Sequence, residues 1–137
     1  MEDASEKTAP ERLRAIQIKL SELARKKNRS PDDITLIAVS KTHGAEAITP
    51  VLEAGHRVFG ENRVQEAAGK WPALRRAYSD VQLHLIGALQ SNKAAEAVGL
   101  FDVIHSLDRP KLAAALARAM AESGRKPRLF VQVNTGD

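Results

Sequence analysis

The first regular pattern of the chain is a helical one over residues 11–27. Apolar side chains recur there three or four positions apart with charged residues between them, at Leu13, Ile16, Leu20 and Leu23. This spacing is typical of an amphipathic helix. After a turn signal at Ser30-Pro31-Asp32, the pattern changes from about residue 34 to short apolar runs separated by longer stretches. The runs cover residues 36–39, 57–60, 81–86, 101–105 and 129–133.

The stretches between the runs carry the start and stop signals of helices. Polar residues that commonly cap a helix precede each stretch, and in two cases a glycine follows it. The predicted segments run from Thr49-Pro50 to Gly55, from Asn62 through Ala67, from Ser91 to Val98, and from Asp108 to Gly124.

Apolar strands linked by helices predict an α/β fold with a parallel sheet. A doubly wound sheet can end on its fifth strand, whereas a (β/α)₈ TIM-type barrel needs eight strands and about 250 residues. If the fold is a barrel, this chain holds about its first five strands. We therefore expect one incomplete domain over residues 1–137 and a longer parent chain.

Composition narrows the class of protein. The chain has 137 residues, of which 43% are hydrophobic, and no cysteine. No apolar stretch approaches the roughly 20 residues of a membrane span, and Met1–Lys7 has no apolar signal-peptide core. We expect a cytoplasmic protein without a membrane partner, a disulfide or a thiolate metal site.

A net charge of +4 and a pI near 9.6 raise the question of a polyanionic partner. The basic residues are, however, dispersed among carboxylates. The densest clusters, residues 25–29 and 75–76, fall near the ends of predicted helices, where cations suit the helix dipole. Few aromatic side chains are available for base stacking. We therefore predict no nucleic-acid partner.

Lys41 is the first candidate functional residue, because it directly follows an apolar run. A lysine there is either a solvated rim charge or an amine whose desolvation favours the neutral form, which attacks carbonyl groups. Parallel α/β folds bind ligands beyond the carboxyl ends of their strands. The other runs also end near polar residues: Asn62, His84 inside its run, His105-Ser106 and Asn134.

Structural roles compete for several of these residues. Asn62 and Ser106 fit ordinary turn and cap positions. His84 fits a hydrogen-bonded core or pocket-wall histidine better than a general base. The four histidines lack the short spacings of metal ligands, so no metal site is predicted. Ser40 and Lys41 are expected on opposite faces of the strand, which argues against a Ser-Lys catalytic pair.

Four motifs in order resemble the pyridoxal phosphate homeostasis protein family. They are Ala38-Val39-Ser40-Lys41-Thr42, then Phe59-Gly60-Glu61-Asn62 with Val64-Gln65-Glu66, then His84-Leu85-Ile86-Gly87 leading to Leu89-Gln90-Ser91-Asn92-Lys93, and finally Val131-Gln132-Val133-Asn134. The match runs from about Ser30 to the last residue.

The resemblance implies a (β/α)₈ barrel of the alanine racemase N-terminal-domain kind that holds pyridoxal 5'-phosphate. Lys41 matches the Schiff-base lysine of the family, and Asn62 and His84 match motif positions around the same pocket. With Ser106 and Asn134 these residues form the predicted cofactor site. The implied function is cofactor carriage and homeostasis without turnover, with apo enzymes that depend on pyridoxal phosphate as expected partners.

The sequence departs from the family pattern in places. His43-Gly44 stand where relatives commonly have Lys-Pro, Ala88 replaces a frequent Pro, and Arg63 replaces a frequent Tyr. The family also binds the cofactor phosphate after its late strands, which are absent here. We expect a monomer at full length, and association if the chain is truncated, because sheet edges and one apolar face would be uncovered.

Two other functions remain open at this stage. The first is a racemase-like enzyme using the same cofactor, which would need a base on each face of the substrate. The only tyrosine, Tyr78, precedes the third run and is far from the strand exits. The second is a basic interaction module that binds no cofactor.

Overall fold

Five parallel strands form one sheet in a computed structural model that describes residues 6–136. Met1–Ser5, most of the segment in which we expected no signal-peptide core, and Asp137 lie outside the described residues. The sheet order is β1-β2-β3-β4-β5. The strands are β1 (Ala38–Val39), β2 (Val58–Glu61), β3 (Gln82–Leu85), β4 (Val103–Leu107) and β5 (Arg128–Val131).

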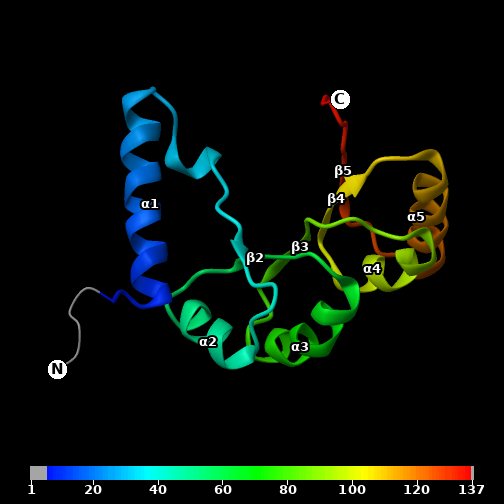
Figure 1. The fold of residues 1–137 in the computed structure, drawn as a ribbon, viewed down its shortest axis with the longest axis horizontal. Helices are drawn as coiled ribbons and strands as arrows, with labels where there is room; N and C mark the ends of the chain where they lie inside the picture. The colour runs from blue at the N-terminus through cyan, green and yellow to red at the C-terminus, as the bar shows by residue number, and fades with distance from the viewer. Residues whose placement is uncertain (1–5, 137) are drawn as a thin grey trace.

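Helices connect successive strands, and a further helix precedes the first strand (Figure 1). They are α1 (Ala9–Lys26), α2 (Ala45–Glu53), α3 (Val64–Ala77), α4 (Ala94–Leu100) and α5 (Pro110–Ser123), with 3₁₀ turns η1 (Pro31–Asp33) and η2 (Ser91–Lys93). In Figure 1, α1 stands at the β1 end of the sheet, beside α2. The predicted N-terminal helix is confirmed with slightly different bounds.

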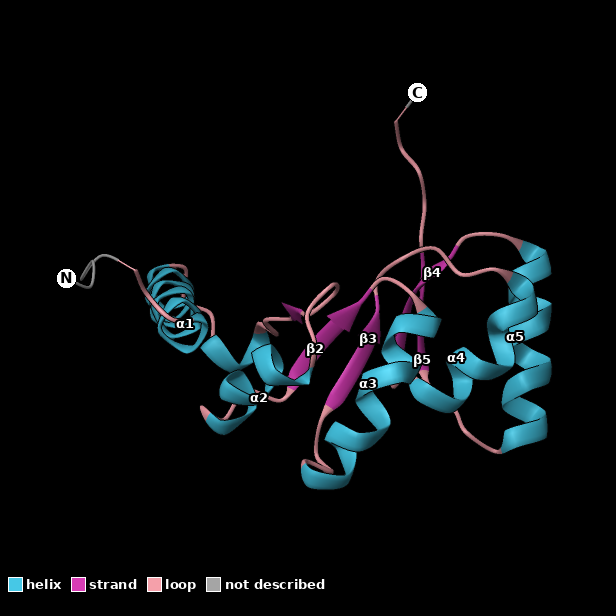
Figure 2. Cartoon of the chain, turned by 60° about the horizontal axis from the view of Figure 1, so that its bottom comes forward, coloured by secondary structure: helices cyan, strands magenta, loops and turns pink. Residues whose placement is uncertain are grey.

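The order of the strands decides between the two parallel folds that the sequence left open. Every strand pairs with its neighbour in sequence, so the order never reverses as it does in a doubly wound sheet. Figure 2 shows α3, α4 and α5 on the same side of the strands. The chain therefore has the α/β architecture of the first five strands of a (β/α)₈ barrel, as predicted.

The hydrophobic core lies between the helices and one face of the sheet. Phe59 and Leu83 are register partners on that face, and both are essentially fully buried. Trp71 of α3 packs on Phe59 with ring centroids 5.0 Å apart. Trp71 and Phe101 are each 0% exposed and anchor this core.

The opposite face of the sheet carries a different set of residues. In parallel pairs the register partners point to the same side, so Val39, Gly60, His84 and Val103 share this face. Val39 of β1 is 48% exposed, and Phe130 of β5, which stacks on His105 with ring centroids 5.0 Å apart, is 45% exposed. The uncovered apolar surface expected from the sequence is therefore present.

Several predicted helix starts are wrong. Helix α2 begins at Ala45 rather than after Thr49, because Thr49 Oγ1 donates to Ala45 O at 2.7 Å within the helix instead of capping it. Helices α3, α4 and α5 likewise have no side-chain cap. The polar residues expected to cap them, Asn62, Ser91 and Asp108, lie two or three positions before the first helical residue, which is too early for a cap, although the helix expected after Asp108 does start at Pro110.

Of the predicted helix ends, that of α5 is confirmed and that of α3 is wrong. Gly124 ends α5 in the left-handed conformation, with φ of 73°, as predicted. Helix α3, however, continues past Ala67 and through Pro72 to Ala77. Burial of Trp71 and Leu74 against the sheet outweighs the loss of one helical hydrogen bond at the proline. Within the described residues, no helix combines the length and apolar character needed to span a bilayer.

Candidate functional site

Lys41 stands in the turn of residues 40–43 that joins β1 to α2. Ser40 continues the strand pairing by donating its backbone N–H to Gly60 O at 2.9 Å. Ser40 is 5% exposed, whereas Lys41 is exposed, which confirms that the two side chains point in opposite directions. Of the two alternatives that the sequence left open for Lys41, the structure matches the solvated one, because the turn carries its side chain away from the helix-facing core.

Asn62 and Gly87 lie side by side at the same edge of the sheet, after β2 and β3. The pairing of the two strands extends to them, since Ile86 N donates to Glu61 O at 2.9 Å. A Cβ atom placed on Gly87 would lie 2.2 Å from the backbone oxygen of Asn62. Gly87 is therefore a close-packing residue that fixes the backbone of Asn62.

His84 lies inside β3 and is paired with His105 of β4. His84 Nδ1 is 2.8 Å from His105 Nε2, and His84 Nε2 is 3.0 Å from Gln82 Oε1. His84 is 5% exposed. It is thus a hydrogen-bonded histidine of the barrel-facing side, as the sequence predicted.

Burial and the neighbouring cations hold His84 in its neutral form. Burial lowers its pKa to about 4, with further lowering by His105 and Arg128 and a partly opposing effect of Asp102. Burial also lowers the pKa of His105, and Arg128 adds to this. The pair is therefore two uncharged imidazoles near neutral pH, one donating to the other.

The depressed pKa of His84 predicts a pH dependence of stability. The unfolded state takes up a proton below about pH 6.5, whereas folded His84 stays neutral, so stability is full above that pH and falls as the pH decreases toward 4. In His84→Gln, the free energy of unfolding measured from about pH 7 to pH 5 should fall less steeply. The exposed His43→Gln variant is the control and should keep the original slope. Equal slopes in all three proteins would contradict this prediction.

Ser106 and Asn134 occupy different surroundings from the other predicted residues. Ser106 in β4 is 2% exposed, and its Oγ has no hydrogen-bond partner among the described residues. Asn134 follows β5, is exposed, and accepts from Gly136 N at 3.0 Å. No hydrogen bond among the described residues joins either side chain to Lys41, Asn62 or His84. The structure thus gathers Lys41 and Asn62 at one edge, places His84 deeper in the sheet, and leaves Asn134 apart.

A buried ion pair lies under the Lys41 turn. Glu61, the last residue of β2, is 0% exposed, and its carboxylate accepts from Ser40 Oγ at 2.6 Å. Lys70 Nζ of α3 lies 2.8 Å from the other oxygen of Glu61, an ion-pair contact. Lys70 Nζ also donates to Ser40 O at 2.8 Å, His43 O at 2.7 Å and Glu66 Oε1 at 3.2 Å.

Glu66 adds a second link between α3 and the same turn. Its carboxylate accepts from the backbone N–H of Thr42. That hydrogen bond, with the one from Lys70, lowers the pKa of Glu66. Sequence reasoning missed Lys70, although two signals were present: a carboxylate at the end of an apolar strand requires a cation, and Glu66 and Lys70 have the i, i+4 spacing of a helical ion pair.

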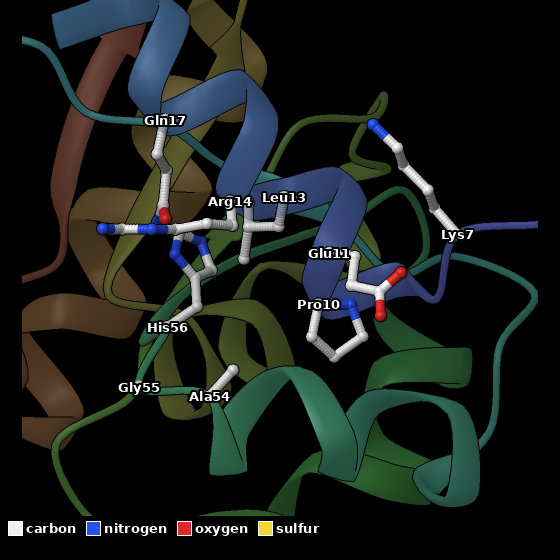
Figure 3. Close-up of a pocket in the computed structure, with 9 residues that line it drawn as sticks. All are labelled: Lys7, Pro10, Glu11, Leu13, Arg14, Gln17, Ala54, Gly55 and His56. Carbon is white, nitrogen blue, oxygen red and sulfur yellow. The ribbon is translucent and has the colours of Figure 1, made fainter.

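An open pocket lies away from this site. It has a volume of about 650 Å³ between the first half of α1 and the loop before β2, with Arg14, Gln17 and His56 on its walls (Figure 3). His56 precedes β2, so this cavity is at the amino end of that strand, away from Lys41. Barrel ligands bind at the other end. Within residues 6–136, no three His, Cys, Asp or Glu side chains gather as metal ligands do.

Comparison with known proteins places this arrangement in a family. The sequence model described as "Alanine racemase, N-terminal domain" matches residues 12–137. This chain belongs to that family. The family match covers all five strands and the whole edge on which Lys41 and Asn62 lie.

Curated relatives in this family agree with the resemblance drawn from the motifs. The pyridoxal phosphate homeostasis protein of Escherichia coli is 37% identical over 91% of this chain and 54% of its own length. That of Synechocystis is 41% identical over 75% of this chain and 47% of its own length. The chain spans about half the length of the curated relatives it matches, and the predicted resemblance is confirmed.

Solved structures give the same result. PipY of Synechococcus elongatus, in a structure with pyridoxal phosphate bound, is 48% identical over 85% of this chain and 55% of its own, with a TM-score of 0.73. A protein of unknown function from Bifidobacterium adolescentis is 27% identical over 85% of this chain and 51% of its own, with a TM-score of 0.77.

Proposed function

We propose that this protein binds pyridoxal phosphate through Lys41 and serves as a carrier of the cofactor. Two similarities support the proposal: relatives at 37–41% identity are pyridoxal phosphate homeostasis proteins, and a 48% identical neighbour has pyridoxal phosphate bound. The single observation that carries it is the state of Lys41, an exposed amine at the carboxyl edge of the sheet that no hydrogen bond or ion pair engages among the described residues.

The contrast with Lys70 supports the choice of lysine. An ammonium group has three N–H donors, and those of Lys70 go to Ser40 O, His43 O and Glu66 Oε1. Lys70 also lies 2.8 Å from the buried Glu61 carboxylate. The Lys70 nitrogen is thus held by four oxygen atoms, whereas no hydrogen bond or ion pair among the described residues holds that of Lys41.

The other residues present also fit the cofactor. Pyridoxal phosphate would supply an aldehyde group, and Lys41 would supply the amine that attaches to it. The residues that would surround it are Asn62 beside Lys41, the uncharged His84, Ser106 and Asn134. Ser106 Oγ fits a ligand-binding role because it is buried without a partner among the described residues. Asn134 and Ser106 belong to the site only as proposed lining residues.

A carrier role fits better than an enzymatic one. The matched relatives carry the names of homeostasis proteins rather than of racemases. Tyr78 ends α3 just before β3, at the amino end of the strand, and its ring stacks under Arg57 rather than facing Lys41. Delivery to apo enzymes that depend on pyridoxal phosphate, a cytoplasmic location and a monomeric state at full length stay predictions.

Reductive trapping tests the assignment of Lys41. The intact protein is incubated with pyridoxal phosphate, reduced with borohydride and digested, and the adduct is located by mass spectrometry. We expect the label on Lys41 and its loss in Lys41→Ala. The Lys93→Ala variant is the control, because Lys93 is also partly exposed and forms only a 3.5 Å surface ion pair with Glu96. It should be labelled at Lys41 as strongly as the unsubstituted protein.

Two results would overturn the proposal. An adduct that is absent from Lys41, or equally abundant in Lys41→Ala, would refute attachment at this residue and favour an interaction module without cofactor. If Lys41 is labelled, an assay for amino-acid racemisation separates the carrier from the enzyme. Turnover that requires Lys41 would then replace the carrier function by a racemase-like one.

A further inference from the structure

The turn that carries Lys41 is held from outside, by helix α3. Ser40 O and His43 O, at the two ends of the turn, both accept from Lys70 Nζ, at 2.8 and 2.7 Å. Thr42 N, between them, donates to Glu66. Three of the four turn residues are thus bonded to two side chains one helical turn apart. Lys41 is the fourth, and its side chain is exposed.

The anchor itself is fixed by burial. The side chain of Lys70 is 10% exposed and that of its partner Glu61 is 0% exposed, with 2.8 Å between Lys70 Nζ and Glu61 Oε1. A buried ion pair adds little net stability, because desolvating both charges offsets their attraction. Its consequence is geometric. The Lys70 ammonium is restrained by contacts with Glu61, Glu66 and both turn carbonyls.

The backbone of the turn is strained at the residue after Lys41. Thr42 has φ of 65°, in the left-handed region. A β-branched residue is an outlier there, and the conformation costs about 1–2 kcal/mol. Such a conformation persists only where the surrounding structure enforces it. The turn closes with a hydrogen bond from His43 N to Ser40 O at 3.2 Å, and two side chains outside it add to this: Glu66, bonded to Thr42 N, and Lys70, bonded to Ser40 O and His43 O.

We propose that Lys70, together with Glu66, is a positioning residue that holds the turn of residues 40–43 in one strained conformation and thereby aims Lys41 at the aldehyde of the cofactor. This inference rests on the proposed function, since it assumes that Lys41 is the point of attachment. Lys70 contacts neither the cofactor nor the reacting atoms in this role. It acts on the direction of the Lys41 side chain alone.

The proposed role of Lys70 predicts different effects on covalent attachment to Lys41 and on noncovalent binding in the pocket. Pyridoxal phosphate uses both the noncovalent pocket and the Lys41 amine, whereas pyridoxine 5'-phosphate lacks the aldehyde and uses only the pocket. A positioning residue for Lys41 therefore affects the first ligand and not the second. Loss of general stability would weaken both.

The experiment compares Lys70→Met and Glu66→Ala with the unsubstituted intact protein. Glu66→Ala is included because it keeps the Glu61–Lys70 pair, whereas Lys70→Met leaves Glu61 buried without its cation. The readouts are the rate of borohydride-trapped label at Lys41, the affinity for each of the two ligands, and hydrogen exchange at the Thr42 amide. The Lys93→Met variant, which removes a surface lysine paired with Glu96, is the control.

We expect labelling of Lys41 to slow by about tenfold to a hundredfold in both variants, the cost typical of a small misplacement of a reacting group. Affinity for pyridoxine 5'-phosphate should stay within about twofold of the original, which corresponds to ~0.4 kcal/mol of binding free energy. Exchange at Thr42 should accelerate in the apo protein. Lys93→Met should change none of these.

Different results would contradict the positioning role of Lys70 and Glu66 and the attachment of the cofactor to Lys41. Unchanged labelling rates in Glu66→Ala and Lys70→Met, or equal losses of affinity for both ligands, would overturn the positioning role while leaving Lys41 as the attachment residue. Absence of label at Lys41 in the unsubstituted protein would overturn the proposed function, and the positioning role with it.

Discussion

Replacing Gly87 with alanine is expected to destabilise the protein by about 3 kcal/mol, near the upper end of what overpacking costs. The added Cβ would lie 2.2 Å from Asn62 O and 2.8 Å from Asn62 Cα. Both atoms belong to the backbone, so no side chain can rotate to make room, and the chain after β2 or β3 must move. Chemical denaturation of the intact protein measures the loss.

The Gly87→Ala substitution should also affect cofactor binding, because it displaces the chain after β2 or β3. Because Asn62 and Gly87 share the carboxyl edge with Lys41, displacing either strand end should also weaken binding of pyridoxal phosphate. The matched control is Gly69→Ala. Gly69 is exposed within α3, and an added Cβ would meet no atom within 4 Å.

Gly69→Ala should stabilise the protein by about 0.5–1 kcal/mol, the usual gain from alanine in a helix interior. The two glycine variants are thus expected to change stability in opposite directions. A Gly87→Ala protein as stable as the original would show that the strand ends move apart freely, against the tight packing described here.

Replacing Trp71 with alanine is expected to cost about 3–5 kcal/mol. Trp71 is 0% exposed and packs on Phe59 of β2 with ring centroids 5.0 Å apart. The surrounding sheet and helix cannot collapse fully into the volume that the indole leaves. Because α3 also carries Glu66 and Lys70, loss of this packing should loosen the Lys41 turn as well, which hydrogen exchange at Thr42 would detect.

Trp71→Phe is the control for the size of the ring. The indole Nε1 has no hydrogen-bond partner among the described residues, so phenylalanine gives up no polar contact there. We expect a loss of about 1–2 kcal/mol, from the smaller volume alone. A Trp71→Ala variant no less stable than Trp71→Phe would refute the contribution of this packing to stability.

The sequence predicted the strands better than the helix starts. An apolar run is a local signal that can be recognised without knowing its neighbours, which is why β2 to β5 were located within two or three residues. Helix starts depend on small differences among nearby polar residues. The Thr49 hydroxyl donates to Ala45 O inside the helix rather than capping its start, which local capping rules do not predict.

Some residues of the candidate site could be predicted from the sequence, and others could not. Lys41 and Asn62 were found because each directly follows an apolar run, and position at a strand end is a property of the sequence. Lys70 was missed because all of its partners except Glu66 lie 9 to 30 residues away, on β2 and on the turn after β1. Only the crossing of α3 behind the sheet brings them together.

By itself the sequence determined the α/β class, the succession of strands and helices, the place of Lys41 at the end of the first strand and the resemblance to pyridoxal phosphate homeostasis proteins. These follow from local apolar patterns and motifs. The tertiary structure decided that the strands are ordered without reversal, that Lys41 is exposed rather than desolvated, and that its turn is bonded to Lys70 and Glu66. Burial and long-range hydrogen bonds are properties of packed elements, and no local pattern specifies them.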